Sequence, residues 1–282
     1  MVLLHSLEAL KDWQSNAGWY DEATGFVPTM GALHEGHSSL IRQAKSQCKR
    51  VVVSVLVNPT QFNDAADFAA YPRTLEDDAA KASAAGADAV FAPTAEDLYG
   101  GKPSSKPIHW GSLTHAYEGA HRPGHFDGVV AVVDLLFQSI SPDVAVFGEK
   151  DLQQVAVVKR LAAERHPGIE VVVGPLVRDR SGLALSSRNA RLSDQGVEQA
   201  LALSRSLRFL QDAARKGEDW KGALERERAA LACSPGVTLE YLDAVDASSF
   251  EPTQPGTSGA IHAVVAAHVE GVRLIDNAPL RT

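Results

Sequence analysis

The segment from Val51 to Val57 restricts the fold of this chain more strongly than any other stretch of its sequence. It reads Val-Val-Val-Ser-Val-Leu-Val, so six of its seven residues are apolar and five are β-branched valines. Such a run is typical of a strand buried on both faces, as in a parallel sheet that is covered by helices on each side. We therefore predict an α/β protein.

Three apolar runs of this chain end in polar loops. Residues 26–27, 51–57 and 143–147 read as buried strands, and each is followed at once by a loop that contains Gly, Pro or polar residues. In open parallel α/β sheets, ligands bind at the carboxyl ends of the strands. We therefore expect the functional site to lie where these three loops meet.

The first of these loops leads into a helix N-terminus. Gly31 breaks the strand, and the apolar spacing that follows predicts a helix over about residues 38–48. A helix N-terminus presents unpaired N–H groups that suit a phosphate. His34 and His37, three residues apart, are placed to donate hydrogen bonds to such a phosphate. Alternatively, His37 only caps the helix and His34 is a surface loop residue.

The other two loops carry polar side chains whose roles the sequence leaves open. Asn58 and Gln61 are either ligand contacts or turn-forming residues. Asp151 and Gln154 match a capping box, which gives each of them a structural role as an alternative to ligand binding. Lys150 has no such structural role, and its place at the tip of a strand-to-helix turn suits an anion.

The character of the chain changes after residue 175. A loop of small residues contains Ser186, Ser187 and Arg188, which can together donate several hydrogen bonds to phosphate, although a solvated loop is the alternative. We predict helices at 193–216 and 219–232 and strands at 237–243, 260–269 and 272–276. The domain prediction is a Rossmann-like domain over 1–175 and a smaller α+β domain over 176–282, a possible lid.

The remaining segments are assigned from periodicity and capping residues. We predict helices at 6–16, 74–85 and 129–140, the last with Asp127 as its N-cap, and a short strand at 88–92. The stretch 94–124 reads as irregular, with short elements near 96–99 and 106–110. Arg122 and His125 precede the buried helix and are either loop residues or ligand contacts.

Charge and cysteine usage argue against several kinds of protein. With 27 Lys and Arg against 35 Asp and Glu, the net charge is −8, which is unsuited to a general nucleic-acid-binding surface. Cys48 and Cys233 stand in no metal-binding spacing and indicate reduced thiols in the cytoplasm. No segment resembles a signal peptide or a membrane span. We therefore expect a cytoplasmic protein without nucleic-acid or membrane partners.

Seven motifs, in order along the chain, carry a resemblance to one enzyme family. They are residues 27–37, 57–62, 71–74, 122–126, 147–154, 182–189 and 273–277. The His-x-Gly-His pattern of the first resembles the signature of Rossmann-like nucleotidyltransferases, a group that includes class I aminoacyl-tRNA synthetases. Taken together, the motifs closely resemble the pantothenate synthetase (pantoate–β-alanine ligase) family from about residue 26 to the C-terminus.

The resemblance implies a fold and a reaction. The fold is a Rossmann-like parallel sheet of the nucleotidyltransferase type with a smaller α+β C-terminal domain. The reaction, a step of pantothenate and coenzyme A biosynthesis, condenses pantoate with β-alanine and converts ATP to AMP and pyrophosphate through a pantoyl-adenylate. Mg²⁺ would be bound mainly through the ATP phosphates, with no protein side chain assigned as a metal ligand. The family is typically homodimeric and cytoplasmic.

The same resemblance assigns roles to individual residues. His37 is the proton donor, and His34, Lys150, Ser186, Ser187 and Arg188 complete the catalytic set. The residues implied to contact ATP are Met30, Gly31, His34, His37, Gly148, Glu149, Lys150, Asp151, Val177, Leu185, Ser186, Ser187 and Arg188. Pantoate is implied to contact Pro28, Met30, Gln61 and Gln154, and Gln61 also lies near β-alanine.

Some positions depart from the usual family pattern. Ala131 and Asp134 stand where Thr and Lys are common, Ser181 stands where Asp is common, and Ser38 replaces a usual leucine. Two rival interpretations remain. One is a nucleotidyltransferase that adenylylates a phosphorylated cofactor precursor, which would need additional basic residues. The other is a non-catalytic nucleotide-binding module, which would bind ATP without splitting it.

Overall fold

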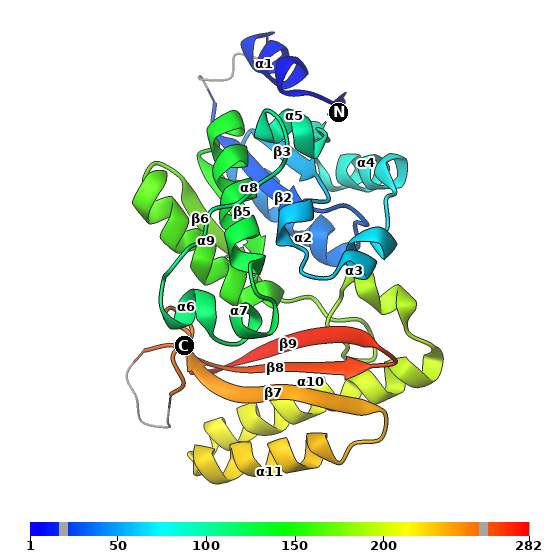
Figure 1. Cartoon of the computed structure of the whole chain (residues 1–282), viewed down its shortest axis with the longest axis vertical. Helices are drawn as coiled ribbons and strands as arrows, with labels where there is room; N and C mark the ends of the chain where they lie inside the picture. The colour runs from blue at the N-terminus through cyan, green and yellow to red at the C-terminus, as the bar shows by residue number, and fades with distance from the viewer. Residues whose placement is uncertain (17–21, 254–258, 282) are drawn as a thin grey trace.

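Two sheets organise the molecule, one above the other in Figure 1. The computed structural model describes residues 1–16, 22–253 and 259–281. The larger sheet has six parallel strands in the order β1-β4-β3-β2-β5-β6. Their bounds are β1 Val2–Leu4, β2 Thr24–Thr29, β3 Arg50–Val55, β4 Ala89–Phe91, β5 Val144–Gly148 and β6 Glu170–Gly174. The predicted α/β fold is confirmed, although β1, with three residues, was too short to be predicted.

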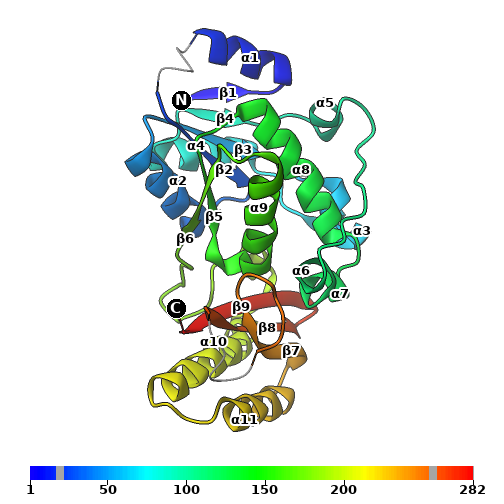
Figure 2. The ribbon, with the colours of Figure 1, turned by 90° about the vertical axis from the view of Figure 1, so that its left-hand side faces the viewer.

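Helices cover both faces of the parallel sheet, as Figure 2 shows. One face carries α2 (Glu35–Gln47) and α4 (Leu75–Ala85), and the other carries α8 (His125–Ile140) and α9 (Leu152–Arg165). Each face of the sheet has its own hydrophobic core, and alternate residues of β3 point to opposite faces. Val51 and Val53 pack in the core on the side of α2 and α4, and Val52 packs in the core on the side of α8 and α9. This arrangement explains why the segment is apolar at nearly every position.

The smaller sheet follows in the C-terminal part of the chain. Its antiparallel strands are β7 (Val237–Asp246), β8 (Ile261–Val269) and β9 (Val272–Arg281), in that order. Helices α10 (Asp194–Arg215) and α11 (Trp220–Ala232) pack on it around a separate core. The α+β character is confirmed, and β9 continues beyond the expected end at Asp276. The domain boundary at 175/176 stays a prediction.

The remaining helices have ten residues or fewer. They are α1 (Leu7–Asn16), α3 (Ala65–Ala70), α5 (Ala95–Tyr99), α6 (Ser112–His115) and α7 (Glu118–His121). The prediction of a surface helix at 6–16 is confirmed by α1, and the element near 96–99 is α5. The prediction of a short element near 106–110 was wrong, because the next helices, α6 and α7, form further along the chain. Helix α3 was not predicted.

One capping prediction was wrong, and one capping alternative that the sequence left open does not form. Helix α8 begins at His125 with Gly124 as its N-cap, in a left-handed conformation with φ 81° that glycine adopts readily. Asp127 lies inside the first turn, and its carboxylate accepts the backbone N–H of Ile108 at 2.9 Å. Asp151 does precede α9, but its side chain makes no capping hydrogen bond, because the helix is entered through a 3₁₀ turn at Glu149–Asp151. The capping box with Gln154 does not form.

No helix among the described residues combines the length and the apolar character that crossing a bilayer requires.

Candidate active site

A cavity lies at the carboxyl ends of β2, β3 and β5, where the sequence analysis placed the site. Strand β2 lies between β3 and β5. The chain continues from β2 to β3 and β4 on one side of it and later to β5 and β6 on the other, so the order of connection changes direction at β2. Ligands bind at such switch points in open α/β sheets. A fourth wall comes from the segment 175–188 that leads into the C-terminal part.

The loop after β2 is held in place by a buried carboxylate from α4. Asp78, which is fully buried, accepts the backbone N–H groups of Ala32 at 3.0 Å and Leu33 at 2.6 Å. Gly31 has φ 86°, and a side chain there would place its Cβ 2.9 Å from the Asp78 carboxylate. The loop therefore requires glycine for its conformation and for space.

The two histidines of this loop combine a structural role with a place in the cavity. His34 is the N-cap of α2 and His37 is its third residue, and they form a reciprocal capping box. The Nδ1 atom of His37 accepts the N–H of His34 at 3.3 Å, and that of His34 accepts the N–H of Gly36 at 3.2 Å. Both side chains line the cavity, with ring centroids 4.1 Å apart. The two alternatives for His37, cap and ligand contact, thus coexist, and His34 is not a surface loop residue.

The protonation state of these rings follows from their contacts. Burial, followed by the charges of His37 and Lys150, lowers the pKa of His34 to about 3. Burial, followed by the charge of Lys150, lowers the pKa of His37 to about 4. Both rings are therefore neutral at pH 7, and because each Nδ1 is an acceptor, each proton lies on Nε2. The pair offers two N–H donors without a positive charge.

Gln61 is fixed at both its backbone and its side chain. It ends the 3₁₀ turn Pro59–Gln61 after β3. Its side-chain oxygen accepts from the Asn58 amide at 3.3 Å, and its side-chain nitrogen donates to Met30 Sδ at 2.9 Å. Asn58 caps the turn and also donates to Gly128 O at 3.2 Å, so the turn-forming alternative is confirmed for this residue.

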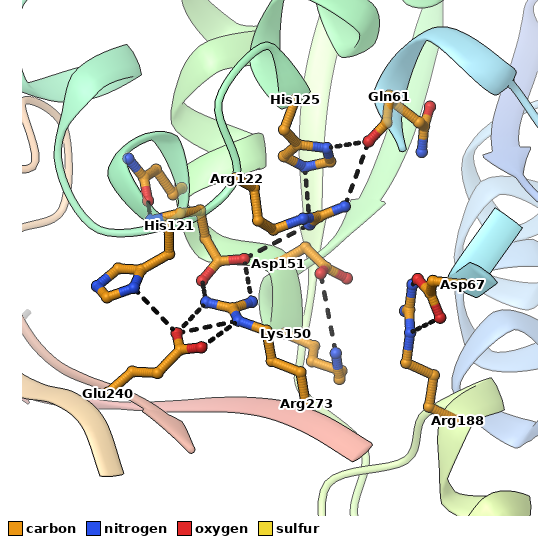
Figure 3. Close-up of polar contacts among 12 residues, drawn as sticks. Gln61, Asp67, His121, Arg122, His125, Lys150, Asp151, Arg188, Glu240 and Arg273 are labelled. Atoms are coloured by element: carbon orange, nitrogen blue, oxygen red, sulfur yellow. Dashed lines mark hydrogen bonds and ion pairs between the residues drawn. The ribbon is translucent and has the colours of Figure 1, made fainter. Parts of the chain in front are cut away.

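Arg122 and His125 hold the carbonyl of the same turn, as Figure 3 shows. Arg122 Nη1 lies 3.1 Å from His125 Nε2, and a guanidinium can only donate, so the His125 proton must lie on Nδ1. That proton is donated to Gln61 O at 2.9 Å, and Arg122 Nη2 donates to the same oxygen at 3.4 Å. Burial and then the charge of Arg122 lower the pKa of His125 to about 3, which agrees with a neutral ring. Both residues line the cavity.

The turn after β5 brings Lys150 into the cavity. Its ammonium lies 3.8 Å from the Asp151 carboxylate, and both residues line the wall. The side-chain amide of Asn277 on β9 donates to the carbonyls of Glu149 at 2.9 Å and of Lys150 at 3.1 Å. The C-terminal sheet thus fixes the backbone of this turn. The carboxylate of Glu149 accepts the N–H of Leu176 at 3.4 Å.

The serine–arginine loop, residues 186–188, is tied to α3 and to Tyr71, the C-cap residue of that helix. Ser187 Oγ and Tyr71 Oη share a hydrogen bond of 3.2 Å, and Ser186 Oγ accepts the N–H of Arg188 at 3.3 Å. Arg188 Nη2 donates to Asp67 on α3 at 2.7 Å. The alternative of a solvated loop is therefore wrong for residues 186–188, whose side chains are held by these contacts.

An apolar wall completes the cavity on the side of α8. Its members are Leu56, Val129, Val132, Val133, Leu136 and Phe147. A cavity with one apolar wall and a few convergent polar groups is the usual form of a small-molecule site.

Most predicted site residues line this cavity. They are Pro28, Met30, His34, His37, Gln61, Gly148, Lys150, Asp151, Gln154, Val177, Leu185, Ser186, Ser187 and Arg188. Gly31 and Glu149 are not among the lining residues, since Gly31 shapes the loop and Glu149 turns towards Leu176. Their contact with ATP stays a prediction. Sequence reasoning missed Asp67, whose partner Arg188 is distant in the chain, whereas Tyr71 lies in one of the motifs.

Within the described residues, no group of three His, Cys, Asp or Glu side chains is arranged to hold a metal ion. The cavity nevertheless offers the Asp151 carboxylate, whose side chain is half exposed, beside Lys150 and the serine–arginine loop. Such a set fits a cation that is held chiefly by phosphate and water.

Comparison with known proteins gives one consistent family. The family model described as pantoate-β-alanine ligase matches residues 2–279. A pantothenate synthetase of a Nocardioides species is 46% identical over 288 residues, covering 99% of this chain and 85% of the relative. A pantothenate synthetase of Cereibacter sphaeroides is 45% identical over 271 residues, with 96% and 95% coverage.

Solved structures agree with this result. The crystal structure of pantothenate synthetase from Thermus thermophilus is similar with a TM-score of 0.92 and 39% identity, and each chain is covered in full. The pantoate-β-alanine ligase of Francisella tularensis, solved in complex with β,γ-ATP and β-alanine, has a TM-score of 0.82 and 31% identity, covering 100% of this chain and 98% of that one.

Proposed function

This chain belongs to the pantoate–β-alanine ligase family, whose members join pantoate to β-alanine with ATP, and on that premise we propose that the cavity performs this reaction through a pantoyl-adenylate. In the first step, a carboxylate oxygen of pantoate attacks the α-phosphorus of ATP and pyrophosphate leaves. In the second step, the uncharged amine of β-alanine attacks the acyl carbon, the bond between that carbon and the phosphate oxygen breaks, AMP leaves, and the nitrogen releases one proton to water. No enzyme nucleophile takes part in either step.

The observation that carries this proposal is the division of the cavity into a cationic part and a neutral part. Lys150 and Arg188 supply cations near the serine loop, and His34 and His37 supply neutral N–H donors at the start of α2. Donors that are already in place can stabilise the charge that develops on phosphate oxygens. This part suits the triphosphate of ATP.

The neutral part suits pantoate. Gln61 and Gln154 present amides, and the wall from α8 is apolar. Pantoate has two hydroxyl groups, a branched hydrocarbon centre and a carboxylate that must remain reactive. Amides orient such groups without the tight ion pair that would stabilise the ground state. The apolar wall matches the branched carbon.

The acceptor β-alanine is assigned to the side of Gln61 that is nearest to Arg122. The Arg122 side chain is largely buried, with 19% of its surface exposed, and it lines the cavity. A guanidinium in that position complements the carboxylate of β-alanine and leaves its amine directed at the acyl group.

Mg²⁺ is proposed to bind through the ATP phosphates and water, with Asp151 the nearest carboxylate on the cavity wall. Bound there, the ion would offset phosphate charge. The homodimer, the cytoplasmic location and the closing of residues 176–282 as a lid stay predictions.

The direct test measures AMP and pyrophosphate formed from ATP and Mg²⁺ while pantoate or β-alanine is omitted. AMP is expected in quantity only when both acids are present, and pantoate alone should support exchange of labelled pyrophosphate into ATP. Binding of ATP without any cleavage would contradict the proposal and favour a pure binding role.

Replacing Gln61 with alanine is expected to raise the KM for pantoate by about tenfold, because it removes an amide held beside Met30 and Asn58. The KM for ATP should change much less. Steady-state kinetics with each substrate varied in turn checks this, and Asn63→Ala in the following loop serves as the control. An equal rise of both constants would contradict the assignment.

A further inference from the structure

A chain of ionic contacts joins the C-terminal sheet to Arg122. Its other members, Arg273 and Glu118, have no role in the proposed reaction. The chain of contacts starts at Arg273 on β9, passes through Glu118 on α7, and reaches Arg122 at the end of α7. Figure 3 shows Arg122 between this network and the pair Gln61–His125.

Arg273 is held by two carboxylates. Its Nη1 and Nη2 atoms donate to the two oxygens of Glu118 at 2.8 and 2.6 Å. Its Nε donates to both oxygens of Glu240 on β7, at 3.1 and 3.0 Å. The pair with Glu118 is bidentate, the strongest geometry for a guanidinium and a carboxylate.

Glu118 has a second cationic neighbour that it holds less tightly. Its Oε2 atom lies 3.5 Å from Arg122 Nη1, beyond the distances to Arg273, and its Oε1 accepts from Tyr241 Oη at 2.7 Å. Burial acts to raise the pKa of Glu118, but hydrogen bonds from Arg273 outweigh it and the pKa is lowered to about 2. Glu118 is therefore a permanent buried anion that both arginines can satisfy.

Arg122 has room to move towards that anion. A second cavity, lined by Glu118, His121, Glu240 and Arg273, also has Arg122 in its wall. Arg122 thus stands between the two cavities, and its present hydrogen bonds to Gln61 O and His125 compete with the attraction of Glu118. A buried carboxylate that lost one arginine would draw the other closer, since an unpaired buried charge is costly.

We propose that Arg273 is a positioning residue for the acceptor end of the active cavity, where it keeps Glu118 from drawing Arg122 away from Gln61. The acceptor end is then correctly formed only while β9 is docked on α7. The identity of the substrate there, β-alanine, rests on the proposed function, but the positioning itself does not.

The kinetic test uses Arg273→Met. The KM for β-alanine is expected to rise by about tenfold or more, as for loss of a hydrogen bond to a charged group. Pantoate-dependent pyrophosphate exchange should stay within about twofold, because the cationic part of the cavity is untouched and His125 still donates to Gln61 O at 2.9 Å. An equal loss in exchange and in ligation would overturn the proposal.

A second substitution distinguishes positioning from simple stabilisation. In Arg273→Met with Glu118→Gln, the carboxylate that draws Arg122 away is gone, so the KM for β-alanine should recover towards the wild-type value. A purely structural role of Arg273 predicts that the single variant loses thermal stability, exchange and ligation together, and that all three recover together in the double variant, because the unpaired buried charge is then gone. That parallel behaviour would refute the mechanism, whereas positioning predicts that exchange stays near the wild-type rate in both variants. Asn277→Ala, on the same strand, is the contrast, because it releases the Lys150 turn and should impair exchange instead.

A crystal structure of Arg273→Met tests the geometry without any activity. The Arg122 guanidinium is expected to have left Gln61 O and to contact Glu118 directly. An Arg122 that stays at Gln61 would overturn the proposal even in an active enzyme. If wild-type protein neither exchanges pyrophosphate nor forms AMP, the proposed function fails, and this structure still decides whether Arg273 positions Arg122.

Discussion

Replacing Lys150 with alanine is expected to lower the turnover of ATP-dependent ligation by about 100-fold or more. The ammonium lies at the tip of the turn after β5, and its side chain is 21% exposed. Its carboxylate neighbour Asp151 is 3.8 Å away, which is too far for a direct hydrogen bond. The charge is thus available to the phosphate oxygens that become more negative as pyrophosphate leaves.

Initial rates of AMP formation at saturating substrates measure this effect. Lys159→Ala is the matched control, because Lys159 is an exposed lysine on α9, the helix that follows the turn. The thermal unfolding midpoint should change little in either variant, since within the described residues the ion pair of the Lys150 ammonium is the loose one with its neighbour Asp151. Near-wild-type turnover in Lys150→Ala would remove this residue from the catalytic set.

The same variant has a second readout in the histidine pair. The charge of Lys150 contributes to the lowered pKa values of His34 and His37. Loss of that charge should therefore raise both values from about 3 and about 4 towards the ordinary value near 6.5, without reaching it, because burial is the larger cause. NMR titration of the ring protons checks the direction.

The position of the site was predictable from local sequence because it depends on local properties. A strand that is apolar on both faces, such as 51–57, must lie inside a covered parallel sheet, and parallel strands place their carboxyl ends at one edge. The polar residues directly after 26–27, 51–57 and 143–147 therefore meet in space. Nothing about distant contacts was needed for that inference.

Contacts between distant residues could not be predicted in the same way. Glu118 and Arg273 are separated by 155 positions, and Asp67 and Arg188 by 121. Each pair forms only because the C-terminal part docks against α7 and α3, and no periodicity records such a contact. The sequence therefore indicated Arg122 as a possible ligand contact but could not indicate what holds it.

The absence of a capping box at α9 has a related cause. Asp151 and Gln154 have the spacing of a capping box, but the chain enters α9 through a 3₁₀ turn whose carbonyls are held by Asn277. Tertiary contact thus overrides the local preference and leaves the two side chains at the cavity wall. The local rule failed at a site where the side chains face the cavity.

Among the departures from the family pattern, Asp134 has a clear local role. Its carboxylate accepts from Arg165 at 2.8 Å and lies 2.6 Å from His166 Nε2. These contacts lie between α8 and the end of α9. We therefore expect no effect of this departure on the cavity.

Replacing His37 with alanine is expected to reduce turnover by about 100-fold or more, through loss of a neutral N–H donor aimed at developing phosphate charge. The substitution also removes the acceptor for the His34 N–H, so the capping box is lost and stability should fall by about 1 kcal/mol. An inactive alanine variant alone cannot separate the chemical role from the structural one.

His37→Glu separates the two roles. Glutamate at the third position of a helix is a regular partner in a capping box, so its carboxylate can accept the His34 N–H in place of Nδ1. The unfolding midpoint should stay close to that of the wild type. Turnover should nevertheless fall at least as far as in His37→Ala, because the donor is gone and a negative charge faces the phosphates.

Calorimetric unfolding and AMP formation, measured on both variants and on His109→Ala as an exposed control, decide between the roles. If the low activity of His37→Ala came only from loss of the capping box, His37→Glu would be nearly as active as the wild type. NMR titration adds an independent check, because the low pKa of about 4 keeps His37 neutral through the range in which an exposed histidine titrates. A His37 midpoint well above 7 in the free protein would mean that the ring is mostly a cation at pH 7, and the neutral-donor role would then be wrong.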